Sequence, residues 1–509
     1  MSFKKNGYKS LIALFVLIIL TLITIVIFKR FNIINHNNDS ASTDIGISTG
    51  IQKSNKIAES ESFIQADNPE SEVTEIITEP NEETSLNGEN KAIIILPGIT
   101  GSELISAKDH KINSSLTVEK GDLIWPPFEF TEIDSELDLI GSATDYVKYA
   151  AISLEMLRLD ENGKTIYDII PKEVTENDLF IGTLSTATLT FNELYNEFSD
   201  THEIIFFSYD WRQSCADIAA SLEEYIDSCG FDDVTFVCHS MGGLVAAHYL
   251  NLNENNISKT NQVITVGTPF GGSPKALMAL QLGRFLDYGI VDPIIKSLSY
   301  NMQSIYELLP NNTEYIYDNG KLLDSVSTYS WLTEDIIIDS LSQKGVNNKV
   351  YTNALNTQAL LDQNGSHIMN NKAIDVCMIA GYNIPTVINL HEKNDYISSV
   401  EESYEGDGTV SIDSSVKYNS EYFDNPIYFI DSAEHRTMLN NKDVVDTIIN
   451  AIKYGSDIPE EYIDHDIVKT KETLKIKNEG IYSTKEINES YVGGAFGIFY
   501  DLLLNYIKE

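Results

Sequence analysis

Short runs of consecutive apolar residues recur along the chain from residue 91 onward. The first covers 92–96, and later ones cover 204–207, 234–238, 263–266, 376–380 and 427–430. Unbroken apolar runs of this length are typical of strands whose two faces are both buried in a parallel sheet. Stretches with helical spacing lie between or after them, at 215–228, 243–252 and 442–454. Strands that alternate with helices predict an α/β fold with a mainly parallel sheet.

The longest apolar run, residues 11–28, lies near the amino terminus and is interrupted only by two threonines. At about 1.5 Å per residue its helix would be roughly 27 Å long, close to the hydrocarbon thickness of a bilayer. Three lysines precede the run, and Lys29 and Arg30 follow it. A cleaved signal peptide usually has a shorter apolar region followed by small residues, so the pattern favours a retained signal anchor over cleavage and secretion. The flanking charges predict an inside amino terminus and a body outside the cytoplasm.

Residues 31–90 have the composition of a linker. No Lys or Arg occurs from 59 to 89, whereas Glu, Ser, Thr, Asn and Pro recur. Like charges repel, and too little apolar surface exists to offset the entropy of ordering such a segment. We therefore expect an anchor at 1–30, an acidic disordered linker at 31–90, a folded domain at 91–455 and a carboxyl-terminal extension at 456–509.

Charge excludes one large class of function. The 509 residues contain 76 Asp and Glu against 35 Lys and Arg, which gives a net charge of −41. Because nucleic-acid binding draws its affinity from clustered basic residues, so acidic a chain is not expected to bind nucleic acid. Only four Cys are present, with no Cys-x-x-Cys pair, and the nine His are scattered. Neither a disulfide scaffold, a metal centre nor a cofactor is expected.

The candidate chemistry is concentrated in Val-Cys-His-Ser-Met-Gly-Gly at 237–243. An apolar strand runs into a turn that carries Ser240, and an Ala- and Leu-rich helix follows, which is the context of a nucleophile elbow. Small residues are needed two positions before and two after the serine because the backbone turns sharply there. Gly242 meets the second requirement, and Cys238 replaces the usual Gly at the first. The amino terminus of the helix favours a developing negative charge on an oxygen near Ser240.

A nucleophilic serine needs a base and a carboxylate to orient that base, and in α/β-hydrolases the chain order is Ser, then Asp or Glu, then His. His435 follows the last apolar strand and precedes the helix at 442–454, which makes it the expected base; the other histidines after Ser240 are His248, His367, His391 and His465. For the carboxylate, Gly-Asp-Gly-Thr-Val at 406–410 favours Asp407, since flanking glycines let a loop present Asp inward. On spacing alone, Asp395, Asp413 and Asp431 remain competitors.

Six segments together resemble the lecithin:cholesterol acyltransferase family. They are Pro-Gly-Ile-Thr-Gly-Ser-Glu-Leu at 97–104, Tyr-Asp-Trp-Arg at 209–212, the His-Ser-Met-Gly-Gly elbow, Gly-Thr-Pro-Phe-Gly-Gly-Ser at 267–273, the Leu-Leu-Pro segment at 304–310, and Gly-Asp-Gly-Thr-Val with the region of His435. The resemblance implies an α/β-hydrolase fold with cap insertions and activity on acyl-ester lipids, and it favours Asp407 as the carboxylate. Cys238 and Ser411 depart from the family pattern, but neither removes a catalytic group.

The resulting hypothesis is a membrane-tethered serine hydrolase or acyltransferase that acts on lipids. Ser240, Asp407 and His435 would form the triad, and the N–H groups of Ile99 and Met241 the oxyanion hole. Inserts at about 105–180 and 274–370 are the cap candidates, in which Trp125 and Trp331 would either pack or meet lipid. An apolar helical face at 496–507 would dock on the body or contact a membrane. The alternatives are a general carboxylesterase or thioesterase, and an inactive lipid-binding protein on the same scaffold.

Overall fold

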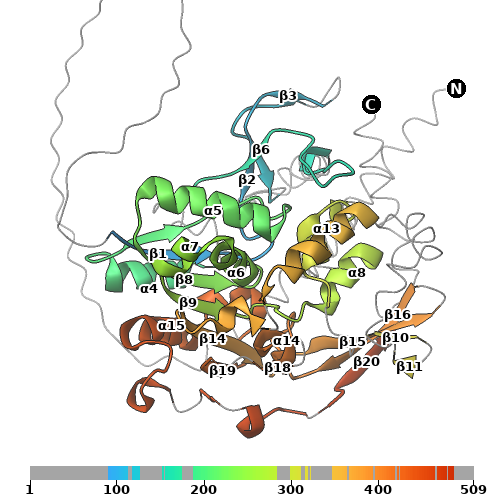
Figure 1. Cartoon of the computed structure of the whole chain (residues 1–509). Helices are drawn as coiled ribbons and strands as arrows, with labels where there is room; N and C mark the ends of the chain where they lie inside the picture. Colours follow the sequence, from blue (N-terminus) through green and yellow to red (C-terminus); the bar gives the residue numbers. More distant parts are fainter. Residues whose placement is uncertain are drawn as a thin grey trace, which may run out of the picture. The chain divides into compact units, whose positions relative to one another are not determined.

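A six-stranded parallel sheet forms the centre of the fold in this computed structural model (Figure 1). Its strands run in the order β19 (Ile427–Asp431), β14 (Asp375–Tyr382), β9 (Thr260–Val266), β8 (Asp233–His239), β1 (Lys91–Leu96) and β7 (Glu203–Phe206). All five neighbouring pairs are parallel. Each apolar run identified from residue 91 onward overlaps one of these strands, and the predicted α/β fold with a mainly parallel sheet is confirmed.

The structure describes residues 90–486 except for 113–116, 127–151, 154, 175–186, 284–297, 311–315, 319–320, 323–346, 364–365, 394–395, 419–420, 423–424, 465–466, 470 and 479. The predicted anchor, nearly all of the predicted linker, Trp331 and the apolar face at 496–507 lie outside the described residues. Within the described ranges, no helix is both long enough and apolar enough to span a bilayer. All described residues belong to one unit.

Strand β1 shows why the central strands are apolar at every position. The side chains of Ile93 and Ile95 belong to a core shared with α4 (Thr188–Phe198) and α15 (Lys442–Tyr454). Those of Ile94 and Leu96 belong to the core on the opposite face, shared with the helices α5 (Cys215–Cys229) and α6 (Gly242–Leu252). Because helices cover both faces of the sheet, alternation of apolar and polar residues is lost.

The helices begin and end at residues suited to those positions. Ser214 precedes α5 and its Oγ accepts a hydrogen bond from the N–H of Ala216, whereas Gly230 ends the helix with φ of 70°. Ser273 caps α8 (Pro274–Leu282) in the same way. Helix α6 packs closely on the loop after β9. A Cβ at Gly243 would lie only 2.1 Å from Thr268 Oγ1, so this close approach requires glycine. These caps and close contacts fix the loops at the carboxyl ends of the strands.

Smaller elements fill the predicted inserts and the loops after the core strands. The first insert contains a three-stranded sheet of β5 (Leu123–Trp125), β2 (Leu104–Ser106) and β6 (Ile169–Pro171), while β3 (His110–Lys111) pairs with β4 (Thr117–Val118). The second contains α8, α10 (Gln303–Glu307), α13 (Asn348–Ala359), η2 (Ile368–Asn370) and the pair β12 (Asp362–Gln363) and β13 (Ser366–His367). The remaining short elements are α7 (Glu254–Lys259), α14 (Ile412–Val416), β17 (Lys417–Tyr418), β18 (Glu421–Tyr422), η3 (His435–Asn440), η4 (Glu460–Tyr462) and η5 (Lys471–Thr473).

A second, five-stranded sheet joins distant parts of the chain. Its order is β11 (Lys321–Leu322), β10 (Ile316–Asp318), β15 (Thr386–Lys393), β16 (Tyr396–Ser403) and β20 (Ser483–Glu486). Strand β20 comes from the carboxyl-terminal extension and pairs antiparallel with β16. The described part of that extension therefore packs on the body of the domain.

Candidate active site

Ser240 lies at the turn between β8 and α6 and has a left-handed backbone, with φ of 54°. Its N–H donates to the carbonyl of Val266 at 2.9 Å, which ties the turn to the neighbouring strand. A Cβ at Gly242 would lie 2.3 Å from the carbonyl oxygen of Leu96, so only glycine fits two residues after the serine. Cys238 is fully buried in the core, where its thiol takes the place of the usual glycine. The strand, turn and helix predicted around Ser240 are all present.

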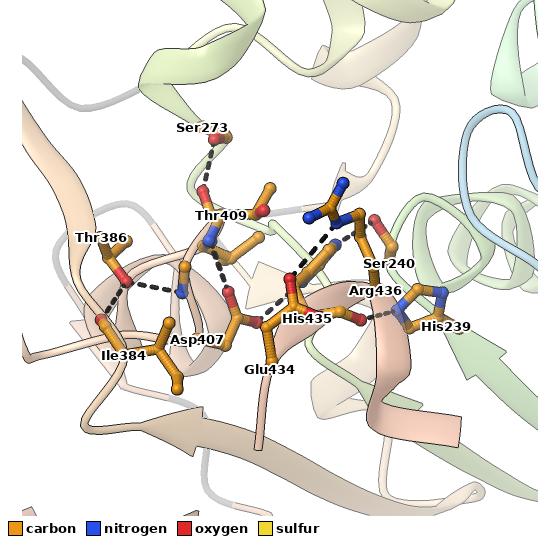
Figure 2. A network of polar contacts seen from close by, with 12 residues as sticks. His239, Ser240, Ser273, Ile384, Thr386, Asp407, Thr409, Glu434, His435 and Arg436 are labelled. Atoms are coloured by element: carbon orange, nitrogen blue, oxygen red, sulfur yellow. Dashed lines mark hydrogen bonds and ion pairs between the residues drawn. The ribbon is translucent and has the colours of Figure 1, made fainter. Parts of the chain in front are cut away.

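The structure brings Ser240, His435 and Asp407 together in one hydrogen-bonded chain (Figure 2). The distance from Ser240 Oγ to His435 Nε2 is 3.0 Å, and that from His435 Nδ1 to Asp407 Oδ2 is 2.7 Å. An ionised carboxylate can only accept, so Nδ1 carries the proton and Nε2 is free to accept from the serine hydroxyl. All three side chains are buried, with residue exposures of 6% for Ser240, 5% for His435 and 1% for Asp407.

The carboxylate of Asp407 is held on both oxygens. Its Oδ1 accepts from the N–H groups of Thr409 at 2.9 Å and Val410 at 2.7 Å, while Oδ2 faces His435. The backbone carbonyl of Asp407 also accepts from the N–H of His435 at 2.9 Å. These bonds fix the carboxylate and join the two loops, so Asp407 is aimed at the imidazole before any substrate binds.

The competing carboxylates have other surroundings. Asp413 lies in α14 and pairs with Lys471 of the carboxyl-terminal extension. Asp431 ends β19 and accepts from the hydroxyl of Ser432 at 2.7 Å. Asp395 lies outside the described residues. Of the three candidates that the structure describes, Asp407 is the one that contacts His435.

His239 is a neighbour of the site that the sequence did not indicate. Its Nε2–H donates to the backbone carbonyl of His435 at 2.7 Å, and the two imidazole rings lie 5.0 Å apart (Figure 2). Burial, together with the nearby His435, lowers the pKa of His239 to about 3. His239 therefore remains neutral at physiological pH, and it supports the backbone of His435 without placing a second positive charge beside it.

Gly267 packs against the hydrogen bond between Asp407 and His435. It follows β9 with φ of 59°, and its N–H donates to the carbonyl of Ile379 at 2.9 Å. A Cβ at this position would lie 3.0 Å from Asp407 Oδ2 and 3.2 Å from His435 Nδ1. Residue 267 opens the Gly-Thr-Pro segment noted in the sequence, but its contact with these two side chains becomes visible only in the fold.

The two predicted oxyanion donors belong to the turn of Ser240 and to the loop after β1. Within the described chain, neither the N–H of Ile99 nor that of Met241 has an acceptor. Met241 directly follows Ser240, while the loop of Ile99 is close enough that a Cβ on Gly98 would lie 2.8 Å from the Cβ of Ser240. Both N–H groups are therefore available near the serine, as an oxyanion site requires.

Aromatic residues hold the loop that carries Ile99. The indole N–H of Trp125 donates to the carbonyl of Thr100 at 3.1 Å, and that of Trp211 donates to the carbonyl of Ser102 at 3.2 Å. The two indole rings also meet edge to face at 5.2 Å. Trp125 is only 5% exposed. Of the two possibilities for this residue, packing is the one the structure shows.

The Tyr-Asp-Trp-Arg segment, whose Trp211 bonds the same loop, is itself held by a buried ion pair. Arg212 is fully buried and its guanidinium donates twice to Asp210, at 2.8 and 2.7 Å, and once to the carbonyl of Leu157 at 2.9 Å. Bidentate pairing satisfies the charge that burial would otherwise penalise. The segment therefore has a structural role beneath the site and does not itself touch Ser240 through any described polar contact.

The other histidines that the structure describes after Ser240 have surroundings of their own. His248 and His367 are each 3% exposed, and burial lowers the pKa to about 4 for His248 and to about 3 for His367. His367 packs edge to face on Phe270 at 5.4 Å. His391 pairs with Glu401 at 2.8 Å, and His465 lies outside the described residues. Among the residues described, no group of His, Cys, Asp and Glu is arranged to hold a metal ion.

Comparison with known proteins gives one family. The family model "Lecithin:cholesterol acyltransferase" matches residues 195–417, a stretch that contains Ser240 and Asp407 and ends before His435. Phospholipase A(1) LCAT3 of Arabidopsis thaliana is 30% identical over 119 residues, which cover 21% of this chain and 27% of that protein. The match thus spans about a quarter of the length of that relative.

Solved structures with low sequence identity are also similar to parts of the chain. The Tle4–Tli4 complex covers 70% of this chain and 96% of its own at 13% identity, with a TM-score of 0.46. The mature lipase BlEst2 of Bacillus licheniformis covers 71% and 90% at 14% identity, with a TM-score of 0.28. Phospholipase PlaB of Legionella pneumophila covers 56% and 62% at 13% identity, also with a TM-score of 0.28. The family model and the curated relative agree with each other, and residues 195–417 of this chain are similar to the lecithin:cholesterol acyltransferase family.

Proposed function

We propose that this protein is a serine acyl-ester hydrolase or O-acyltransferase that acts on lipids through an acyl-enzyme. The observation that carries the proposal is the buried chain of hydrogen bonds from Asp407 through His435 to Ser240, with Ser240 on a left-handed turn before a helix. The match of residues 195–417 to the lecithin:cholesterol acyltransferase family model supports a lipid acyl ester as the substrate. Both supports point to the same reaction class from independent observations.

In the proposed mechanism, Ser240 Oγ attacks the ester carbonyl while His435 Nε2 takes the hydroxyl proton. Asp407 accepts from Nδ1–H throughout, which keeps the imidazole in the required tautomer and stabilises the imidazolium that forms. The negative charge on the carbonyl oxygen is stabilised by the N–H groups of Met241 and Ile99. Collapse of the tetrahedral intermediate expels the alcohol, which receives the proton from His435 and leaves the acyl group on Ser240.

The acyl-enzyme then reacts with a second nucleophile, which His435 activates in the same way. Water gives a free fatty acid and makes the protein a phospholipase or lipase, whereas a lipid alcohol gives a new ester. Exclusion of water from the closed site decides between these outcomes. We also propose that the anchor at 1–30 holds the domain at a membrane outside the cytoplasm, where such lipids are present.

The first experiment tests the nucleophile, the base and the carboxylate. A fluorophosphonate should label the protein at Ser240 and abolish esterase activity. Ser240→Ala and His435→Ala should each lower turnover on the order of a million-fold. Asp407→Asn should lower it on the order of ten-thousand-fold by stabilising the wrong tautomer. The matched control is Asp431→Asn, which changes a carboxylate that contacts Ser432 and should retain activity. Near wild-type turnover of Asp407→Asn with a severe loss in Asp431→Asn would refute the assignment.

A second experiment identifies the acceptor. Vesicles of a labelled phospholipid are incubated with the enzyme in the presence and absence of a sterol or a lysolipid, and the products are separated. Release of labelled fatty acid alone indicates a hydrolase, whereas a labelled sterol ester or a re-acylated lysolipid indicates an acyltransferase. Cleavage of soluble short-chain esters or thioesters with no product from vesicles would contradict the proposal of a lipid substrate.

A further inference from the structure

Asn383 lies between the loop of Asp407 and the carboxyl-terminal extension. It directly follows β14, is 2% exposed, and has a left-handed backbone with φ of 67°. A buried amide needs partners for both its oxygen and its nitrogen. Both partners are backbone groups of the extension: Asn383 Nδ2 donates to the carbonyl of Lys475 at 3.1 Å, and Oδ1 accepts from the N–H of Lys477 at 2.8 Å. The side chain therefore binds the extension at two points, in the manner of a neighbouring strand.

The backbone of the same residue holds the Asp407 loop. The N–H of Asn383 donates to the carbonyl of Tyr404 at 2.8 Å, and the N–H of Ile384 donates to that of Gly406 at 3.1 Å. Ile384 and Asp407 form an isolated parallel bridge. Figure 2 shows Ile384 beside the Asp407 loop. A shift of Asn383 would thus be transmitted to Asp407 through two backbone bonds within a few residues.

The extension is itself firmly attached, so it can serve as a support. The side chains of Val468, Leu474 and Ile476 pack against an apolar cluster formed by Ala380, Tyr382, Ile412, Val416 and Phe429. Residue 468 also exchanges two backbone hydrogen bonds with residue 429, and β20 pairs with β16. The cluster includes Ile412 and Val416 of α14, the helix that follows the Asp407 loop, and β20 pairs with β16, the strand before that loop. The extension therefore holds the Asp407 loop at both of its ends.

A further contact reaches the loop that carries His435. The ammonium group of Lys477 donates to the carbonyl of Asn383 at 3.3 Å and to the hydroxyl of Ser432 at 3.4 Å. Ser432 lies three residues before His435, and its own N–H donates to the carbonyl of Tyr382 at 2.8 Å. The extension thus contacts the supports of both the carboxylate and the base.

We propose that Asn383 is a positioning residue for catalysis, which joins the extension at 467–486 to the loops of Asp407 and His435. The carboxyl-terminal extension is then part of the catalytic apparatus and not an appendage. This inference rests on the proposed function, because it concerns the alignment of the same triad. It predicts that loss of the amide bonds of Asn383 slows the chemical step without weakening substrate binding.

The test compares Asn383→Gly with Asn450→Gly in the full chain. Glycine retains the left-handed backbone at 383 but removes both amide bonds. Asn450 is the matched control, because its Nδ2 also bonds the extension, at the carbonyl of Tyr462 at 2.9 Å, but from α15. Active sites are titrated with a fluorophosphonate, so that turnover is expressed per correctly folded site, and KM is measured with a short-chain ester.

For Asn383→Gly we expect kcat per titrated site and the rate of phosphonylation to fall together by about tenfold, with KM unchanged. Asn383→Asp retains the acceptor for the N–H of Lys477, so its kcat per titrated site should lie between that of Asn383→Gly and that of wild type. This variant serves as the test if glycine impairs folding. Asn450→Gly should retain wild-type kcat per site. Wild-type kcat per site in Asn383→Gly and Asn383→Asp, as in Asn450→Gly, would overturn the inference while leaving the proposed function intact. A wild-type protein that is not phosphonylated would instead overturn the proposed function.

Discussion

Replacing Gly267 with alanine is the sharpest single test of the triad geometry. The new methyl would lie 3.0 Å from Asp407 Oδ2, 3.0 Å from Met438 Sδ and 3.2 Å from His435 Nδ1. Asp407 cannot retreat easily, because Thr409 and Val410 hold its other oxygen. The methyl should therefore displace the imidazole, the carboxylate or both by a few tenths of an ångström.

Gly267→Ala has two effects, the cost of a left-handed alanine backbone and the crowding of Asp407 and His435, and a control variant separates them. Alanine in a left-handed conformation costs about 1–2 kcal/mol, which the reduced entropy of the unfolded chain offsets by about 0.4–1 kcal/mol. Gly230, with φ of 70°, has no atom within 4 Å of its would-be Cβ, so Gly230→Ala has only this backbone effect. Since a misplacement of about 1 Å can cost about a hundredfold in rate, a few tenths of an ångström should cost Gly267→Ala about tenfold in kcat.

The assay measures the free energy of unfolding and kcat per fluorophosphonate-titrated site for both variants. Each should lose about 1 kcal/mol of stability from the backbone effect, and only Gly267→Ala should lose turnover. If Gly267→Ala keeps wild-type kcat per site, the packing of this residue against the Asp407–His435 pair has no catalytic consequence and the argument from crowding is wrong.

Three further predictions follow from particular residues. Cys238→Ala should retain most activity, because the buried thiol only fills the position before the elbow; a loss comparable to Ser240→Ala in a folded protein would show that the thiol takes part in the chemistry. Stability should fall on acidification below pH 6.5, by up to about 4 kcal/mol per pH unit, because unfolding lets His239, His248 and His367 take up protons that their lowered pKa values of about 3, about 4 and about 3 exclude in the fold. Urea unfolding at a series of pH values measures this slope, and His248→Gln should lower it by about a third. Deletion of residues 1–35 should leave a folded enzyme that cleaves dispersed short-chain esters but is slower on anionic vesicles, because the body carries a large negative charge. Added salt should recover part of the activity on anionic vesicles. Equal rates on anionic and zwitterionic vesicles at low salt would contradict the electrostatic part of this prediction.

The central sheet, Ser240 and His435 could be predicted because their signals are local, whereas the choice of Asp407 over Asp395, Asp413 and Asp431 also needed the family resemblance. An unbroken apolar run identifies each core strand, and the serine, the Gly-Asp-Gly loop and the histidine after the last strand follow a known chain order. The five-stranded sheet had no such signal, because β15 mixes Asn389, His391 and Glu392 with its apolar residues. The pairing of β15 with β10 and that of β16 with β20 also join segments that lie far apart in the sequence. The strands of this sheet were accordingly not predicted.

The supports of the triad were missed for a related reason. Asn383 looks like an ordinary turn residue until Lys475 and Lys477, more than ninety positions later, are seen to bind its side chain. His239 and Gly267 lie inside recognised motifs, yet their contacts with His435 come from residues more than 160 positions away. No periodicity or spacing encodes such contacts, because they depend on how loops from different strands meet at one edge of the sheet.

Backbone strain locates this site independently of any motif. In the described part of the chain, four residues other than glycine have positive φ, and they are Thr100, Ser240, Asn383 and Ser432. Thr100 follows the predicted oxyanion donor at 99, and Ser240 is the expected nucleophile. Asn383 bonds the backbone at Tyr404, beside the loop of Asp407, and Ser432 lies three residues before His435. Each such conformation costs about 1–2 kcal/mol and persists only where the surroundings determine it. Because all four lie in the loops that form one site, the fold holds unfavourable backbone where the alignment of the triad needs it, and the bonds of Asn383 to the extension are one of the means.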